Sequence, residues 1–264
     1  MFEQILNDKP AVFLASDLHL GAPNREASAL REKHFVHWLD HIKPQAAALI
    51  LLGDIFDFWF EYKHVIPKGF IRIQGKLAEW KDAGIPIYIF TGNHDIWMKE
   101  YFTQELGIPV FHHPVNATIK GHICHLAHGD GLGPGDHGFK WMKRIFTNPF
   151  AQWAYAWLHP DIGIPLAQYF SGSSRKAHVA KDAIHFGEQE FLFQYTLQQA
   201  TVQPETRYFI FGHRHRPEII KMPSNQKMIN LGDWIQHFSF AVIEEEGVSL
   251  CQFTLDGSVQ TLAT

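Results

Sequence analysis

The chain has 264 residues, of which 46% are hydrophobic, and a formal net charge of -4. These values predict one globular domain spanning 1–264 with a sizeable core, and they argue against a broad nucleic-acid-binding surface. Two distant cysteines, Cys124 and Cys251, offer no disulfide framework, which is typical of a reducing compartment. We recognise neither a signal peptide nor a transmembrane segment, so we expect a cytoplasmic protein.

Strands and helices alternate in the first half of the chain. Apolar runs at 11–15, 46–52 and 85–90 predict strands, and helical spacing of apolar residues predicts helices at 26–42, 70–83 and 97–106. A hairpin is expected at 115–119 and 122–127, around Lys120-Gly121. This order of elements predicts an α/β (α+β) sandwich.

Helical spacing dominates from 133 to 199, where aromatic residues are frequent and prolines interrupt the pattern. We interpret 133–199 as a helical insertion between two core strands of the same domain. A strand at 207–211 follows it, and short strands at 218–222, 227–231, 239–243 and 248–255 complete the chain.

Five of the predicted strands end in turns that are rich in oxygen and imidazole donors. In chain order the turns are Ser16-Asp17-Leu18-His19, Gly53-Asp54, Gly92-Asn93-His94-Asp95, His128-Gly129-Asp130 and Gly212-His213-Arg214-His215. Any single turn of this kind could be an Asx-capped loop. Five of them, each after an apolar run, indicate instead that the donors meet at one metal site.

The donors supplied by these turns are Asp17, His19, Asp54, Asn93, His128, His213 and His215. Six or seven such donors suit two divalent ions better than one, and a pair of ions is the usual arrangement for phosphoester hydrolysis. A carboxylate can bridge two ions, and we expect Asp54 to be that bridge. The donor types alone leave manganese, iron, cobalt and zinc open.

The order of these motifs resembles that of the calcineurin-like metallophosphoesterases. The resemblance implies the metallophosphoesterase fold, which is a sandwich of two sheets flanked by helices, and two divalent metal ions, often Mn²⁺. It assigns one ion to Asp17, His19, Asp54 and His215, and the other to Asp54, Asn93, His128 and His213. It also makes His94 the catalytic histidine, with Asp95 to orient it.

A narrower resemblance, to the UDP-2,3-diacylglucosamine hydrolases, rests on four longer motifs and on Ser173-Ser174-Arg175-Lys176 in the insertion. The motifs are Ser16-Asp17-Leu18-His19-Leu20-Gly21, Gly53-Asp54-Ile55-Phe56-Asp57-Phe58-Trp59, Gly212-His213-Arg214-His215-Arg216-Pro217 and Asn230-Leu231-Gly232-Asp233-Trp234. The resemblance implies cleavage of a UDP-linked diacylglucosamine into UMP and the acylated sugar 1-phosphate, a step in lipid A synthesis. The chain departs from the best-known members in carrying His94 where they carry arginine.

An acylated substrate requires an apolar surface, which the aromatic-rich insertion could provide as a lid. Alternatively, these aromatic residues only pack the insertion onto the core. Lys140, Lys143 and Arg144 share one helical face, which could meet phosphates or lipid headgroups or could be a solvated surface. We expect substrate contacts from Asn93, His94, Trp59, Lys140, Arg175 and Lys176. Asp57, Asp130 and Asp233 are candidates for supporting the histidine ligands.

Three functions remain open from the sequence. The first is hydrolysis of an amphiphilic UDP-sugar lipid, by an enzyme that is cytoplasmic or peripheral on the inner face of the inner membrane. The second is a soluble phosphodiesterase or phosphatase acting on nucleotides or phosphoproteins, which His94 favours. The third is an inactive protein-binding scaffold, against which the complete ligand series argues. We infer no nucleic-acid partner and no obligate protein partner.

Overall fold

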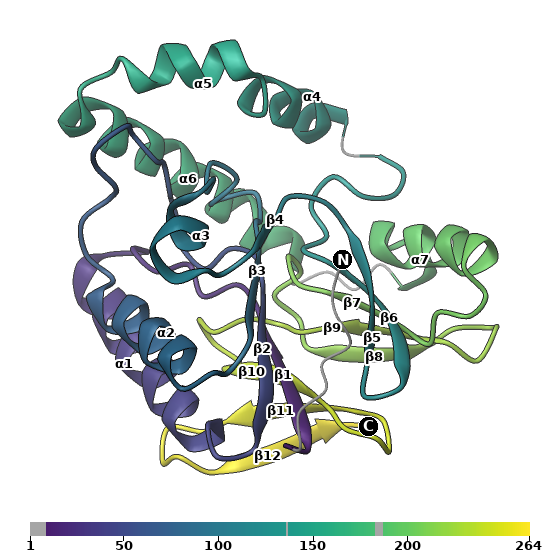
Figure 1. Cartoon of the computed structure of the whole chain (residues 1–264). Helices are drawn as coiled ribbons and strands as arrows, with labels where there is room; N and C mark the ends of the chain where they lie inside the picture. Colours follow the sequence, from purple (N-terminus) through teal and green to yellow (C-terminus); the bar gives the residue numbers. More distant parts are fainter. Residues whose placement is uncertain (1–8, 136, 183–186) are drawn as a thin grey trace.

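The computed structural model describes residues 9–135, 137–182 and 187–264. Two β-sheets pack face to face, and helices cover their outer faces (Figure 1). The first sheet has the strand order β12-β11-β10-β1-β2-β3-β4, and the second has the order β5-β6-β7-β9-β8. This architecture confirms the two-sheet sandwich predicted from the sequence.

The strands agree with the predicted ones to within a few residues. The first sheet contains β1 (Ala11–Ala15), β2 (Ala46–Leu52), β3 (Ile87–Phe90), β4 (Val110–Phe111), β10 (Ser239–Ile243), β11 (Val248–Phe253) and β12 (Val259–Ala263). The second contains β5 (Val115–Ile119), β6 (His122–Ala127), β7 (Tyr208–Phe211), β8 (Glu218–Lys221) and β9 (Lys227–Asn230). The sequence analysis missed β4, which has two residues, and β12, whose residues are mostly exposed. Neither strand carries the apolar run on which the prediction depended.

The central strands are apolar throughout because both of their faces are buried. In β1, Val12 and Leu14 belong to the core between the two sheets, whereas Phe13 and Ala15 belong to the core between the first sheet and its helices. Strands β1, β2 and β3 are parallel, as are β6, β7 and β9. The loops at their carboxyl ends therefore meet at one edge of the sandwich.

Helices form the outer layers of the sandwich. Helix α1 (Arg25–Ile42) begins after Asn24, whose side chain accepts a hydrogen bond from the backbone N–H of Ala27. With α2 (Ile71–Asp82) and α3 (Tyr101–Leu106), α1 covers the first sheet (Figure 1). Helix α7 (Phe191–Val202) covers the second sheet, where Leu192 and Phe193 share a core cluster with Phe209 and Phe211.

Three more helices lie between β6 and β7 in the chain, as the helical insertion predicts. They are α4 (His137–Phe146), α5 (Pro149–Ala156) and α6 (Pro160–Asp182), and they lie over the upper edge of the sandwich in Figure 1. A short 3-10 helix, η1 (Gly187–Gln189), leads to α7. The range 133–199 therefore includes most of α7, although α7 packs as a layer of the sandwich. The boundaries of the domain and of its insertion stay a prediction. Within the described ranges, no helix combines the length and the apolar character needed to cross a bilayer.

Candidate metal centre

The predicted ligands follow the carboxyl ends of β1, β2, β3, β6 and β7. Four of them have left-handed backbone conformations, with φ of 56° at Asp17, 43° at His19, 50° at Asp54 and 66° at His213. Side chains other than glycine rarely adopt this region, and such strain is concentrated at functional sites. These backbone angles turn the chain sharply after β1, β2 and β7.

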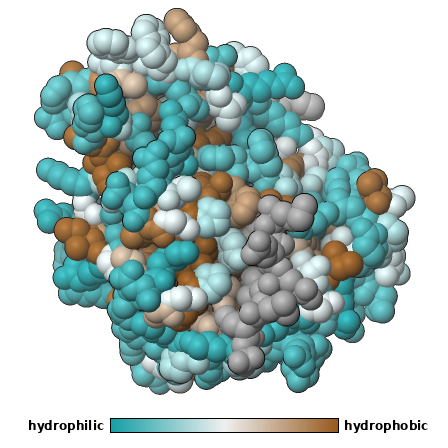
Figure 2. Space-filling model, viewed as in Figure 1, coloured by the Kyte–Doolittle hydropathy of each residue, from teal (hydrophilic) through white to brown (hydrophobic). Residues whose placement is uncertain are grey.

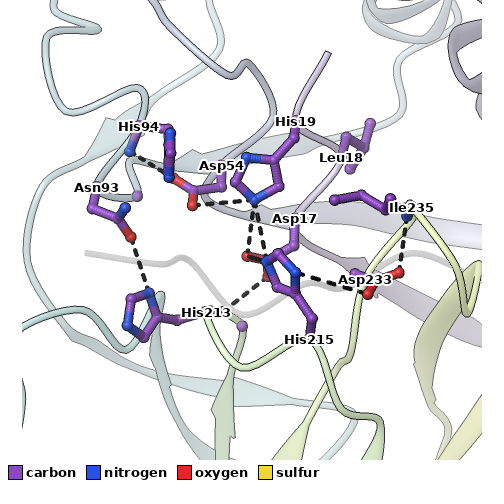
Figure 3. A network of polar contacts seen from close by, with 12 residues as sticks. Asp17, Leu18, His19, Asp54, Asn93, His94, His213, His215, Asp233 and Ile235 are labelled. Atoms are coloured by element: carbon purple, nitrogen blue, oxygen red, sulfur yellow. Dashed lines mark hydrogen bonds and ion pairs between the residues drawn. The ribbon is translucent and has the colours of Figure 1, made fainter. Parts of the chain in front are cut away.

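One group of donors consists of Asp17, His19, His215 and Asp54 (Figure 3). The Nε2 atoms of His19 and His215 lie 3.2 Å apart. Asp17 Oδ1 is 3.8 Å from His19 Nε2 and 3.3 Å from His215 Nε2, and Asp54 Oδ2 is 3.5 Å from His19 Nε2. The donor atoms of all four side chains therefore lie close together, and the binding of one ion by these four residues stays a prediction.

The second group also includes Asp54. Its Oδ2 atom lies 3.4 Å from His128 Nε2, and that nitrogen lies 3.3 Å from Asn93 Oδ1. The Asn93 oxygen is in turn 2.9 Å from His213 Nδ1. Because one oxygen of Asp54 is in reach of both His19 and His128, its position suits a carboxylate shared by two ions.

Not every donor atom of the two groups is satisfied by a hydrogen bond within the described residues. Asp17 Oδ1 is buried and has no hydrogen-bond partner among the described residues. The Nδ1 atom of His19 is 3.5 Å from Asp57 Oδ1, and that of His215 is 3.9 Å from Asp233 Oδ2. Neither distance is a hydrogen bond. An ion bound at the two Nε2 atoms would leave Nδ1–H facing these carboxylates, which is the usual arrangement for histidines that bind metal.

Electrostatics also favour bound cations at these buried groups. Burial alone raises the pKa of Asp17, but the nearby His19 and His215 lower it well below its usual value. Burial lowers the pKa of His128, yet the charge of Asp54 and its contact with the ring raise it to about 10. The carboxylates therefore make this site strongly attractive to positive charge, whether it arrives as protons or as metal ions.

His94 lies beside the two groups, and its ring is 4.7 Å from that of His19 between centroids. Its backbone N–H donates to Asp54 Oδ1 at 2.8 Å. Its Nδ1 atom faces Ser171 Oγ at 2.7 Å and Asp57 Oδ1 at 3.7 Å. Ser171 comes from α6 and was not selected by the sequence analysis.

The expectation that Asp95 orients His94 is wrong. The Asp95 carboxylate instead accepts hydrogen bonds from the backbone N–H groups of Gly92 at 2.7 Å and Ile55 at 2.8 Å. Burial and the negative charge of Asp54 raise the pKa of Asp95 to about 7. Asp95 therefore shapes the turn that carries Asp54 and does not support the His94 ring.

The structure contradicts one of the predicted substrate contacts, that of Trp59. Trp59 is completely buried and its ring stacks on that of Phe56 at 4.4 Å, so it offers no surface to a substrate and this prediction is wrong. The Lys140 ammonium donates to the carbonyl oxygen of Gly133. The side chains of Arg175 and Lys176 lie outside the described residues, so their predicted contacts stay predictions.

The basic face of α4 is partly neutralised. Lys143 Nζ pairs with Asp130 Oδ2 at 2.5 Å, so Asp130 holds this lysine and not a histidine ligand. Arg144 is exposed on the same helix. Of the three predicted supporting carboxylates, Asp57 and Asp233 are the ones that face ligand histidines.

Comparison with known proteins identifies the family of this chain. A family model described as calcineurin-like phosphoesterase matches residues 11–217. A UDP-2,3-diacylglucosamine hydrolase from Porphyromonas gingivalis is 36% identical over 243 residues, covering 88% of this chain and 93% of that protein. Another, from Pseudomonas fluorescens, is 30% identical over 248 residues, covering 92% and 95%. Among solved structures, vacuolar protein sorting 29 from Cryptosporidium parvum has a TM-score of 0.49 and 13% identity, covering 97% of this chain and 96% of its own. The chain belongs to the calcineurin-like phosphoesterase family.

Proposed function

We propose that this protein hydrolyses the pyrophosphate bond of UDP-2,3-diacylglucosamine, giving UMP and 2,3-diacylglucosamine 1-phosphate. The observation that carries the proposal is its similarity to UDP-2,3-diacylglucosamine hydrolases over about nine-tenths of the chain, with 36% identity to one and 30% to another. The donor cluster supports the same reaction type, because two-metal sites are common in enzymes that cleave phosphoester bonds.

The residues of the cluster have separate roles in this proposal. Asp17, His19 and His215 would hold one divalent ion, Asn93, His128 and His213 the other, and Asp54 both, and we propose Mn²⁺ as the native metal. A bound pair of ions supplies Lewis-acid activation of water and neutralises charge on phosphoryl oxygens. The His94 ring would stabilise or protonate the leaving oxygen, for which its place beside His19 and Asp54 is suitable.

The insertion carries the features expected for an amphiphilic substrate. Its exposed large apolar side chains are Trp141, Ile145, Phe150, Trp153, Trp157, Leu158, Ile162, Leu166, Tyr169 and Phe170. Figure 2 shows pale and light brown atoms among teal ones along the upper edge of the molecule, where Figure 1 places α5. An exposed apolar surface of this kind marks an interaction site, and tryptophan and tyrosine favour the membrane interface.

The decisive experiment is substrate profiling of the purified protein with Mn²⁺. We expect UMP release from UDP-2,3-diacylglucosamine in mixed micelles, measured by chromatography, at a much higher kcat/KM than for bis(p-nitrophenyl) phosphate. The Asp54→Ala variant is the control for contaminating hydrolases. Turnover of the simple phosphodiester without UMP release would contradict the lipid substrate and leave the phosphoesterase chemistry intact.

A second candidate function is a phosphodiesterase or phosphatase of the same family with a nucleotide or phosphoprotein substrate. His94 favours it, since the best-known diacylglucosamine hydrolases carry arginine there. The same profiling separates the two functions. An inactive scaffold would instead bind less than one equivalent of metal and turn over none of these substrates.

We infer further that the exposed face of α4–α6 contacts the membrane surface from which such a lipid would be taken. Trp153 and Trp157 are 57% and 76% exposed, and Leu255, in the turn between β11 and β12, is 77% exposed. The double variant Trp153→Ser and Trp157→Ser should sediment less with anionic phospholipid vesicles than the native chain. Leu255→Ser should sediment as the native chain does. Equal sedimentation of all three proteins would contradict the membrane contact.

A further inference from the structure

Ser171 connects the helical insertion to the metal centre. It lies on α6, yet its Oγ atom is 2.7 Å from Nδ1 of His94. The same oxygen is 2.9 Å from the carbonyl oxygen of Asp57 and 3.0 Å from Asp57 Oδ2. A side chain of the insertion therefore touches both the candidate catalytic histidine and a carboxylate that faces the ligand His19.

The chemistry of these atoms sets the direction of the hydrogen bonds. Both Asp57 oxygens can only accept, so the Ser171 hydroxyl donates its proton to Asp57. Its lone pair then accepts from Nδ1–H of His94. Two more oxygens near this nitrogen, the Asp57 carbonyl at 3.3 Å and Asp57 Oδ1 at 3.7 Å, are also acceptors. The arrangement assigns the Nδ1–H tautomer to neutral His94 and leaves Nε2 as the nitrogen that can act on a substrate.

We propose that Ser171 is a positioning residue that holds the His94 ring in this tautomer and orientation, so that the packed insertion helix completes the site. The inference rests on the proposed catalytic role of His94. The contact is well shielded, because the His94 and Asp57 side chains are 5% and 7% exposed. Asp57 Oδ1 also lies 3.5 Å from His19 Nδ1, so the same carboxylate that faces a metal ligand anchors Ser171.

Loss of the Ser171 hydroxyl would remove an oxygen that is closer to His94 Nδ1 than either Asp57 oxygen is. The ring would keep the Asp57 carbonyl at 3.3 Å but would lose the group that fixes its rotation. Small misplacements of a catalytic group cost up to about 100-fold in rate. We therefore expect Ser171→Ala to lower kcat by about 10- to 100-fold, with KM for the substrate nearly unchanged.

The test is a double-mutant cycle on kcat with Ser171→Ala, His94→Ala and the double variant. If Ser171 acts through His94, its substitution should have no further effect once His94 is alanine. Ser171→Thr and Ser171→Val form a matched pair of similar shape that differs in the hydroxyl, and only the threonine variant should recover turnover. Gln168→Ala, at an exposed position of the same helix, is the control for α6 and should behave as the native chain.

The outcomes separate this inference from the proposed function. Independent losses that multiply in the double variant, or equal activity of the threonine and valine variants, would overturn the positioning role. A rise in KM with unchanged kcat in Ser171→Ala would make Ser171 a substrate contact and would also overturn it. If His94→Ala itself turns over normally, the proposed role of His94 fails and this inference fails with it. Native kcat in Ser171→Ala beside a deficient His94→Ala overturns the inference alone.

Discussion

Gly92 lies so close to the carboxylate of Asp54, the proposed shared ligand, that an alanine there would displace it. A Cβ atom at position 92 would lie 2.2 Å from Asp54 Oδ1 and 2.7 Å from Asp54 Cγ. An unstrained contact needs about 3.5 Å, so the carboxylate or the Gly92 backbone must move by roughly 1 Å. Gly92 is not among the residues with positive φ. Gly92→Ala is therefore a steric perturbation of Asp54 without left-handed backbone strain.

The expected size of this effect follows from the displacement. A misplacement of 1 Å near reacting groups lowers the rate by about 100-fold, and overpacking a core destabilises it by about 1–3 kcal/mol. We expect Gly92→Ala to lose one of two metal equivalents and to lower kcat/KM by about 100-fold or more. Metal content after gel filtration, steady-state hydrolysis and chemical denaturation measure the three quantities separately.

Gly75 provides the matched control. It lies within α2, and a Cβ atom there would meet nothing within 4 Å. Alanine inside a helix is favoured over glycine by roughly 0.5–1 kcal/mol, so Gly75→Ala should keep native metal content and turnover with equal or higher stability. If Gly92→Ala binds two equivalents and turns over like the native chain, the Asp54 position is not critical and the reasoning fails.

Three further measurements test the site and the core. Asp54→Ala removes the donor common to both groups and should abolish binding of a second equivalent in a Mn²⁺ titration; two equivalents would refute the shared carboxylate. Burial lowers the pKa of His125 from 6.5 to about 4, so the unfolded chain binds a proton at this residue more tightly than the folded chain does. His125 therefore lowers the free energy of unfolding as the pH falls below 6.5. The loss is about 2 kcal/mol between pH 7 and pH 5, and denaturation of His125→Asn should therefore show a smaller loss than the native chain over that range. Burial also raises the pKa of the Cys124 thiol, so iodoacetamide at pH 8 should leave Cys124 unmodified in the folded protein and label it after unfolding.

The ligand positions were predictable because each depends on local sequence and on the topology. An apolar run that ends in Gly-Asp or Gly-Asn-His-Asp specifies a strand followed by a polar turn. Parallel strands then bring those turns to one edge, which places His19 beside His215 although they are 196 residues apart. The sequence did not have to specify any distance between these two residues for their closeness to be predictable.

The contacts of the ligands with other side chains could not be predicted in this way. Proximity in sequence suggested Asp95 as the partner of His94, but the groups at its Nδ1 atom come from Asp57, 37 residues away, and from Ser171, 77 residues away. Trp59 was misjudged for a related reason, since its position after the Asp54 turn does not reveal that Phe56 and Phe102 enclose it. Such contacts depend on how helices pack after the strands are in place.

The insertion shows why composition alone left two interpretations open. Some of its aromatic residues pack on the core, since Tyr155 lies 4.6 Å from Phe60 and 4.7 Å from Trp97 between ring centroids. Others on the same helix, such as Trp153 at 57% exposure, face solvent. Packing onto the core is therefore correct for one face, and the exposed face is the part on which the proposed lipid contact depends. The attached face carries Ser171 to the His94 ring. A substrate that moves the exposed face would, in the proposed function, also move a group that positions the catalytic histidine, so acyl-chain binding and the chemical step would be coupled through α6.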